Sequence, residues 1–233
     1  AAVAEYLDQG FRAIKFGWGV FGQDLELDIS LVKAAREEAG PNIDLMVDAG
    51  WYGVAYDNPY RPRALKDWIR VVDALENLDV FWLEDFLHPD NLAGYAAVAA
   101  RATTLRLAAG EQYAGVAEFE RLADEGRVDV LQPDLSRCGG ITIGKQIADL
   151  AMRRGIECAP HAWLTDLLTA ASLHLNAYLM HSLYLEYNVS SASLLTNLCH
   201  PKLEMADGYI TIPADPGLGV QIDEEIARRY RIL

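Results

Sequence analysis

The segment VFWLEDF (residues 80–86) joins four apolar residues to two carboxylates, Glu84 and Asp85. An apolar run of this length is typical of a strand that is buried on both faces, as in a parallel sheet. In parallel α/β folds, ligands bind beyond the carboxyl ends of the strands, so Glu84 is placed to face a functional site. Taken alone, the two acids are explained equally well as the start of a solvated loop.

A titratable residue closes one apolar run after another along the chain, at intervals of 23 to 36 residues. These residues are Asp48, Glu84, Glu111, Asp134, His161 and Glu186. One unit of a (β/α) barrel takes about 30 residues, and acids scattered over a solvated surface would not follow that period. The sequence therefore predicts an α/β fold of the TIM-like barrel type, with polar residues at the carboxyl ends of its strands.

The hydrophobic period, together with Gly, Pro and capping residues, predicts seven strands and seven helices. The strands should cover residues 11–16, 43–48, 80–86, 105–111, 128–133, 156–159 and 183–186. The helices should cover residues 1–9, 25–39, 63–78, 90–102, 117–124, 139–154 and 165–180. We expect residues 1–193 to form the barrel and residues 194–233 to form a C-terminal segment that is irregular at first.

The predicted strands are one fewer than the eight of a closed barrel. We expect the missing first strand to precede Ala1, because a barrel with one strand removed has two unpaired edges. That loss should exceed the roughly 5–15 kcal/mol by which a domain is normally stable. Residues 1–233 alone are therefore not expected to act as an active monomer.

The composition excludes several kinds of partner. The net charge of −14 over 233 residues argues against nucleic acid and against anionic membrane surfaces. No apolar stretch is long enough to span a bilayer. The cysteines Cys138, Cys158 and Cys199 are widely spaced and form no CxxC pair, so we expect free buried thiols in a reducing, cytoplasmic compartment. We also expect a homo-oligomer.

Three carboxylates, Asp48, Glu84 and Glu111, end consecutive predicted strands. Neighbouring strands lie about 4.8 Å apart, so the three side chains should crowd together. Like charges at that distance are costly unless a cation lies between them. Hard oxygen ligands on a rigid scaffold favour Mg²⁺. The alternative is that each acid is paired with its own arginine.

Asp134 and His161 end the next two predicted strands. This spacing allows the carboxylate to orient the imidazole and raise its basicity, which favours a general base. The alternative for His161 is a hydrogen-bonded loop histidine. Glu186 is expected at the opposite wall of the site, with Lys15 across from it on an early strand. The aromatic loop residues Trp51, Tyr52, Tyr56 and Tyr60 either line a sugar pocket or cover the mouth of the barrel.

The ordered set of residues resembles the mandelate racemase subgroup of the enolase superfamily. The set comprises Lys15, Asp48, Glu84, Glu111, the run Gln132-Pro133-Asp134, Pro160-His161 and Glu186. The closing segment ADGYITIPADPGLGV (residues 206–220) is also similar to the C-terminal signature of that family. The resemblance covers nearly the whole chain, and its specificity lies in the order of the set rather than in any one motif.

The resemblance implies a modified (β/α)₇β barrel and an α+β capping domain, built mostly from sequence upstream of Ala1, toward which residues 194–233 would return. It also implies Mg²⁺ on Asp48, Glu84 and Glu111, and abstraction of the proton α to a substrate carboxylate, giving an enediolate. Asp134 and His161 would be the base dyad, and Glu186 would hydrogen bond the substrate carboxylate.

Three positions depart from the resembled pattern. The racemases have Lys-x-Lys where this chain has Lys15-Phe16-Gly17, so the second base is absent. Gly50 stands where an Asn is common, and Phe86 stands where a Pro is usual. The missing second Lys favours a one-base reaction, in which His161 takes the α-proton and later protonates the leaving β-hydroxyl, whereas Gly50 removes one polar contact with substrate.

The sequence is therefore interpreted as a Mg²⁺-dependent acid-sugar dehydratase. Its substrate would be a small-molecule sugar acid or 2-hydroxy acid. One alternative is a racemase or epimerase of a 2-hydroxy acid that uses Lys15 as its second base. Another is a non-catalytic barrel, or a fragment whose role is assembly.

Overall fold

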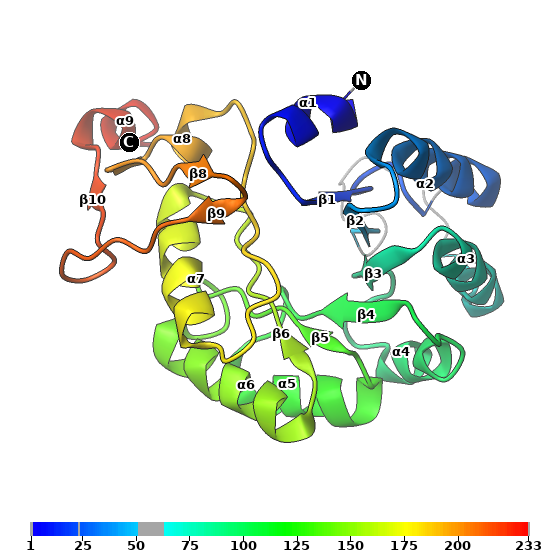
Figure 1. Ribbon diagram of the computed structural model, residues 1–233. Coiled ribbons are helices and arrows are strands. Elements are labelled where there is room, and N and C mark those ends of the chain that lie inside the picture. The colour runs from blue at the N-terminus through cyan, green and yellow to red at the C-terminus, as the bar shows by residue number, and fades with distance from the viewer. Residues whose placement is uncertain (1, 23, 51–62, 233) are drawn as a thin grey trace. The chain divides into compact units, whose positions relative to one another are not determined.

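A computed structural model of the chain describes residues 2–22, 24–50 and 63–232 (Figure 1). The chain divides into two compact units. The first comprises Ala1–Ala109 and Arg121–Val130, and the second comprises Gly110–Glu120 and Leu131–Leu233. The aromatic loop residues Trp51, Tyr52, Tyr56 and Tyr60 lie outside the described residues.

Six short strands form one sheet in the order of the chain, β1-β2-β3-β4-β5-β6. They are β1 (Ala13–Phe16), β2 (Asp44–Asp48), β3 (Val80–Glu84), β4 (Arg106–Ala109), β5 (Val130–Leu131) and β6 (Glu157–Cys158). The pairs β1–β2, β2–β3 and β3–β4 are parallel. Each of the six strands lies within a predicted strand, so the predicted α/β order is confirmed for these six.

The register of the first strands decides which side chains share a face. Asp48 lies opposite Glu84, and Glu84 lies opposite Ala108, so the two carboxylates stand side by side at the carboxyl ends of β2 and β3. Lys15 lies opposite Met46, two residues before Asp48. Because side chains alternate along a strand, Lys15 and Asp48 point to the same face.

The seventh predicted strand, residues 183–186, is wrong, because this stretch of the described chain contains no strand. One of its backbone carbonyls is bonded by a side chain: the amide of Asn176 donates to the carbonyl oxygen of Tyr184 at 3.0 Å. A side chain from the preceding helix thus takes the place of a ladder partner there.

The predicted helices are present with small changes of boundary. They are α1 (Ala2–Asp8), α2 (Leu25–Ala39), α3 (Leu65–Asn77), α4 (Leu92–Ala99), α5 (Gly115–Arg121) with a π-helical turn at Leu122–Gly126, α6 (Gly140–Arg154) and α7 (Asp166–Tyr178). The N-cap of α4 is Asn91, whose side chain accepts from the backbone N–H of Gly94.

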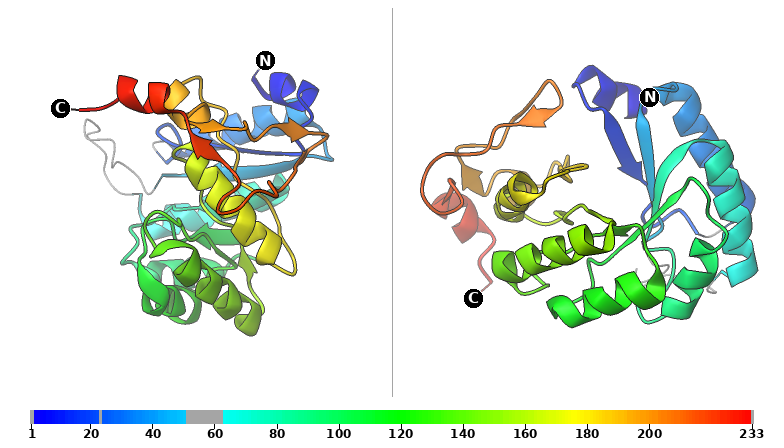
Figure 2. Two further views of the ribbon diagram at one scale, coloured as in Figure 1. Left: turned by 90° about the vertical axis from the view of Figure 1, so that its left-hand side faces the viewer. Right: turned by 60° about the horizontal axis from the view of Figure 1, so that its bottom comes forward.

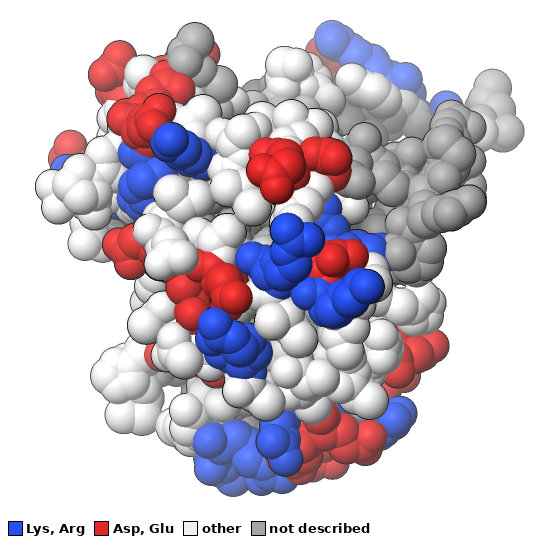
Figure 3. All heavy atoms as spheres, turned by 90° about the vertical axis from the view of Figure 1, so that its right-hand side faces the viewer, with Lys and Arg blue, Asp and Glu red and all other residues white. Residues whose placement is uncertain are grey.

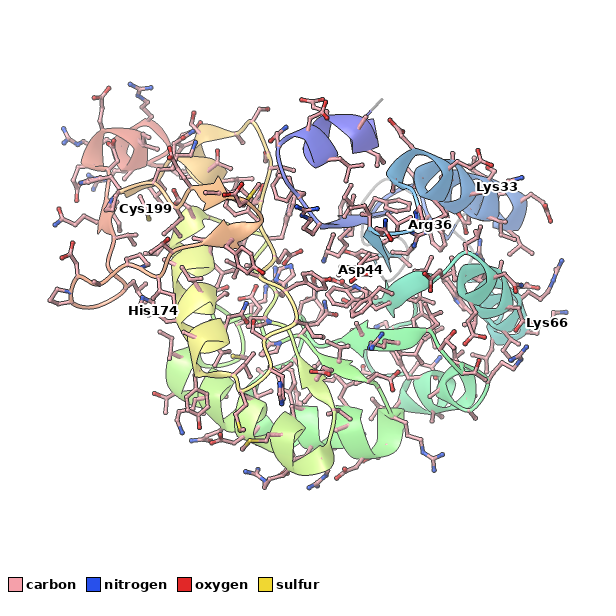
Figure 4. All side chains as sticks on the ribbon, viewed as in Figure 1. Lys33, Arg36, Asp44, Lys66, His174 and Cys199 are labelled. Carbon is pink, nitrogen blue, oxygen red and sulfur yellow. The ribbon has the colours of Figure 1, made fainter. Side chains whose placement is uncertain are left out.

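Helices α2, α3 and α4 pack in succession beside strands β1 to β4 in the first unit (Figure 2). Arg36 of α2 points toward β2, whereas Lys33 points away from it (Figure 4). The guanidinium of Arg36 donates to four backbone carbonyls in the turns that precede β2 and β3. They belong to Gly40, Ile43, Leu78 and Asp79. One side chain therefore satisfies the carbonyls of two turns at the amino ends of these strands.

A run of aromatic rings fills the core of the first unit. The ring centroids of Phe21 and Trp68 are 6.5 Å apart, those of Trp68 and Phe86 are 5.4 Å apart, and those of Phe86 and Tyr95 are 4.7 Å apart. The run connects the loop after β1, helix α3, the exit of β3 and helix α4. Phe86 is fully buried at the centre of the run. The residue that stands where the resembled family usually has a Pro is therefore part of the core.

Glu76, near the end of α3, receives several hydrogen bonds from the turn before β4. Its Oε1 accepts from the backbone N–H groups of Thr103, Thr104 and Leu105, at 2.5, 2.7 and 3.2 Å. Desolvation raises the pKa of Glu76, but these hydrogen bonds outweigh it and lower the pKa to about 2. The carboxylate therefore fastens α3 to the start of β4.

In the second unit, α6 packs on α7, and the C-terminal segment packs on α7. This segment holds α8 (Ser193–Thr196), β7 (Cys199–His200), β8 (Met205–Ala206), β9 (Tyr209–Ile210), β10 (Gln221–Ile222) and α9 (Glu224–Arg229). The ring of His174 on α7 donates to the carbonyl oxygen of Leu218 at 3.1 Å (Figure 4). Apolar contacts of Leu203 and Leu218 with α7 complete the attachment.

The three cysteines are free and buried, as the sequence predicts. Burial raises the pKa of Cys138 to about 11 and that of Cys158 and Cys199 to about 12. Among residues 2–22, 24–50 and 63–232, no helix is both long and apolar enough to cross a membrane. Cationic and anionic side chains are interspersed over the face in Figure 3.

We predict that Phe86→Ala lowers the free energy of unfolding by about 3–5 kcal/mol, because it removes the ring that joins Trp68 to Tyr95. Urea titration followed by circular dichroism measures the loss. Phe86→Leu, which keeps most of the volume, should cost less. A loss below about 1 kcal/mol for the alanine variant would contradict this account of the core.

We predict that Glu76→Gln lowers stability at neutral pH by about 1 kcal/mol, since solvent screens this partly exposed charge. The folded pKa of Glu76 lies below its ordinary value of 4.5, so its contribution is complete above that pH and disappears as the pH falls through about 2. The stability difference between the two proteins should shrink over that range. Glu37→Gln, on the exposed side of α2, is the control; a difference independent of pH would contradict the assignment.

Candidate active site

Lys15, Asp48 and Glu84 form one cluster at the carboxyl ends of β1, β2 and β3. The Nζ atom of Lys15 lies 2.6 Å from Glu84 Oε1 and 3.6 Å from Asp48 Oδ2. Glu84 is only 1% exposed, whereas Lys15 and Asp48 are half-buried. Two neighbouring carboxylates that share one ammonium group are the arrangement that their parallel register requires, because like charges so close need a cation.

The second oxygen of each carboxylate is held by a fixed donor. Trp82 Nε1 donates to Glu84 Oε2 at 3.0 Å, and the backbone N–H of Gly50 donates to Asp48 Oδ1 at 2.7 Å. Both carboxylates are thus oriented, with Oε1 of Glu84 and Oδ2 of Asp48 facing the same cation. This is a donor set that fits a hard divalent cation.

Within the described ranges of the chain, no group of three or more His, Cys, Asp or Glu side chains is arranged to hold a metal ion. Asp48 and Glu84 belong to the first unit, and Glu111 belongs to the second. The predicted convergence of all three on one Mg²⁺ therefore stays a prediction. Glu111 has an arginine partner, as the alternative expects: its Oε1 lies 3.3 Å from Nη1 of Arg137.

His161 is the centre of a second cluster, in the second unit. Its Nδ1 lies 2.8 Å from Asp134 Oδ2, and its Nε2 lies 3.0 Å from Glu111 Oε2 and 3.8 Å from Glu186 Oε2. Asp134 and His161 are buried. A carboxylate accepts hydrogen bonds, so Nδ1–H donates to Asp134, and the opposite ring nitrogen faces two further carboxylates. The predicted pairing of Asp134 with His161 is present.

Asp134 is itself oriented by the turn that follows β5. The backbone N–H and the hydroxyl of Ser136 donate to its Oδ1, at 2.7 and 2.5 Å. Burial raises the pKa of Asp134, but the hydrogen bonds from His161 and Ser136 outweigh burial and hold the pKa below its usual value. Asp134 is therefore a carboxylate with both oxygens occupied, one of them by the imidazole.

Sequence reasoning missed two residues of this cluster, Ser136 and Arg137. Arg137 contacts two carboxylates: its Nη1 lies 3.3 Å from Glu111 Oε1, and its Nε lies 3.8 Å from Asp134 Oδ2. The available signal was their position two and three residues after Asp134, where the side chain of an Asp commonly bonds its own turn.

Glu186 lies in a segment that does not form a strand. Its Oε2 accepts from the backbone N–H of Ala162 at 2.5 Å, which ties the segment after α7 to the residue that follows His161. Asn188, two residues further, donates to the carbonyl oxygen of Leu164 at 3.2 Å. The two contacts hold residues 186–188 against the loop that carries the imidazole.

The arrangement supports proton transfer. A buried imidazole oriented by a carboxylate on one nitrogen can accept or deliver a proton through the other. The carboxylates at the ends of neighbouring strands can act as ligands for a cation. The ammonium group of Lys15 beside them can contact a polar substrate.

The model of the family described as "Enolase C-terminal domain-like" matches residues 1–226. D-galactarolactone cycloisomerase from Agrobacterium fabrum is 30% identical over 240 residues, which cover 99% of this chain and 59% of that protein. D-galactonate dehydratase from Ralstonia nicotianae is 36% identical over 162 residues, which cover 67% of this chain and 42% of that protein.

The crystal structure of 3,6-anhydro-D-galactonate cycloisomerase from Zobellia galactanivorans is similar, with a TM-score of 0.87 and 29% identity. The similarity covers 98% of this chain and 61% of that one. The chain thus spans about half the length of the curated relatives that it matches.

Proposed function

The chain belongs to the enolase C-terminal domain-like family, and from this premise we propose that it carries the catalytic groups of a Mg²⁺-dependent acid-sugar dehydratase. The observation that carries the proposal is the buried His161–Asp134 pair, whose second ring nitrogen faces the carboxylates of Glu111 and Glu186. Curated relatives named as dehydratases and cycloisomerases of sugar acids support this reaction class. The substrate would be a small-molecule sugar acid or 2-hydroxy acid.

In the proposed reaction His161 moves the proton. Its Nε2 takes the proton α to the substrate carboxylate, and the electron pair of the broken C–H bond passes into the enediolate. The same nitrogen then delivers its proton to the β-hydroxyl, which leaves as water while the double bond forms. Asp134 stabilises the imidazolium between the two steps through its contact with Nδ1.

Asp48, Glu84 and Glu111 would hold Mg²⁺, which, when bound, supplies positive charge to the enediolate oxygens. Glu186 in its protonated form would hydrogen bond the substrate carboxylate. Lys15 would act by charge, since its ammonium group contacts both Asp48 and Glu84. These contacts weigh against the racemase alternative, in which Lys15 would take a proton from substrate.

The alternatives of a non-catalytic barrel or an assembly fragment are less consistent with the burial of the clusters. Buried carboxylates and a buried imidazole cost desolvation energy that a purely structural core avoids. We further propose a cytoplasmic homo-oligomer. In it, residues 194–233 would return toward a capping domain; helix α8 begins at Ser193, one residue before that boundary.

We predict that Glu84→Gln weakens Mg²⁺ binding by more than about tenfold, because it removes one anionic ligand. Isothermal titration of the full-length protein with MgCl₂ measures the affinity, and circular dichroism checks that the fold is kept. Glu37→Gln removes an exposed acid from α2 and serves as the matched control. Equal affinity in the Glu84 variant and in the unchanged protein would end the metal assignment.

We predict that His161→Asn in the full-length enzyme lowers exchange of the substrate α-proton in D₂O by about 10²–10⁴-fold, the usual contribution of a general base. Proton NMR with D-galactonate and a library of other acid sugars measures the exchange. His174→Asn is the control, because it removes a histidine of α7 that contacts the C-terminal segment instead of the carboxylates; exchange in this variant should be normal. Persistent exchange in the His161 variant would move the role of base to Lys15 and revive the racemase alternative.

A further inference from the structure

The loop after β1 displays an indole to solvent. Trp18 is 65% exposed, whereas Phe21, three residues later, is buried against Trp68. The amide N–H of Phe21 also donates to the carbonyl oxygen of Gly17 at 2.8 Å, so the loop is a closed turn. The buried ring anchors the loop, and the exposed ring is carried on the anchored turn.

Two glycines bring this turn against the end of β2. A Cβ atom at Gly17 would lie 2.7 Å from the carbonyl oxygen of Asp48, and a Cβ at Gly50 would lie 2.5 Å from Cδ1 of Trp18. Both glycines also have positive φ values, 123° and 61°. The indole thus lies directly over the backbone of Gly50, in space that any side chain at position 50 would need.

The same glycine connects the indole to the carboxylate cluster. The N–H of Gly50 donates to Asp48 Oδ1 at 2.7 Å, and Asp48 shares Lys15 with Glu84. Trp18 therefore borders the charged cluster of the first unit. A single exposed apolar side chain on a protein surface needs no explanation by itself. A ring that lies against the backbone of Gly50, whose N–H holds the Asp48 carboxylate, is a more specific arrangement.

We infer that Trp18 forms an apolar wall of the substrate site and determines specificity by stacking on the carbon chain of the sugar acid. This inference rests on the proposed function. A sugar acid offers a charged carboxylate at one end and a face of C–H groups along its chain. The carboxylate end would lie toward the cation proposed to bind at the cluster, and the C–H face suits the planar surface of an indole.

The test compares Trp18→Ala and Trp18→Phe with the unchanged protein, all as the full-length enzyme, on the acid sugar that it converts fastest. We expect KM to rise about tenfold in the alanine variant and about two- to threefold in the phenylalanine variant, because stacking is lost wholly or in part. The kcat value should stay within about threefold, since Trp18 is not one of the proposed proton-transfer groups. Tyr209→Ala, which removes a ring that is 81% exposed on β9, should leave both constants unchanged.

Gly50→Ala provides a second variant, since its Cβ would displace the indole while leaving Trp18 in the sequence; it also strains the backbone whose N–H holds Asp48, so a fall in kcat is expected with it. It should reproduce the higher KM of Trp18→Ala. Turnover by the unchanged protein with KM unaffected in both Trp18 variants would overturn this inference and leave the proposed function standing. Failure of the unchanged protein to bind or convert any acid sugar in the library, checked by isothermal titration with D-galactonate, would overturn both.

Discussion

The proximity of Asp48 and Glu84 is the constraint on which the first unit depends. Parallel pairing of β2 with β3 sets Asp48 and Glu84 level with each other on one face of the sheet. A cation must therefore lie near them, and Lys15 supplies it from the next strand. The length of the lysine side chain matters, because its Cα lies level with Met46, below the carboxylates it contacts.

The surroundings of the cluster keep these charges in place. Trp82 fixes one oxygen of Glu84 from within the same strand, and Gly50 fixes one oxygen of Asp48 from the following turn. The aromatic run through Phe86 holds the exit of β3 against α3 and α4. The charged residue Glu84 and the packed residue Phe86 therefore lie close together in one short segment, residues 80–86.

Much of this arrangement could be predicted from the sequence, because apolar runs at a regular period give the positions and order of the strands. Six strands and the Asp134–His161 pair are examples. Contacts that depend on tertiary structure could not be predicted: residues 183–186 form no strand, since Asn176 bonds Tyr184 instead. Likewise, Ser136 and Arg137 have no pattern that distinguishes them from ordinary turn residues, and nothing local indicates that Trp18 occupies the space beside Gly50.

The hydrogen bond from Trp82 to Glu84 has an optical consequence. Indole emission responds to the electric field along the ring, and the Trp82 ring N–H ends on a carboxylate oxygen 3.0 Å away. A change in the charge balanced by Glu84 alters that field, although the indole itself stays buried in the sheet. The chain therefore contains its own fluorescent reporter on the electrostatic state of the carboxylate pair, one that needs no label.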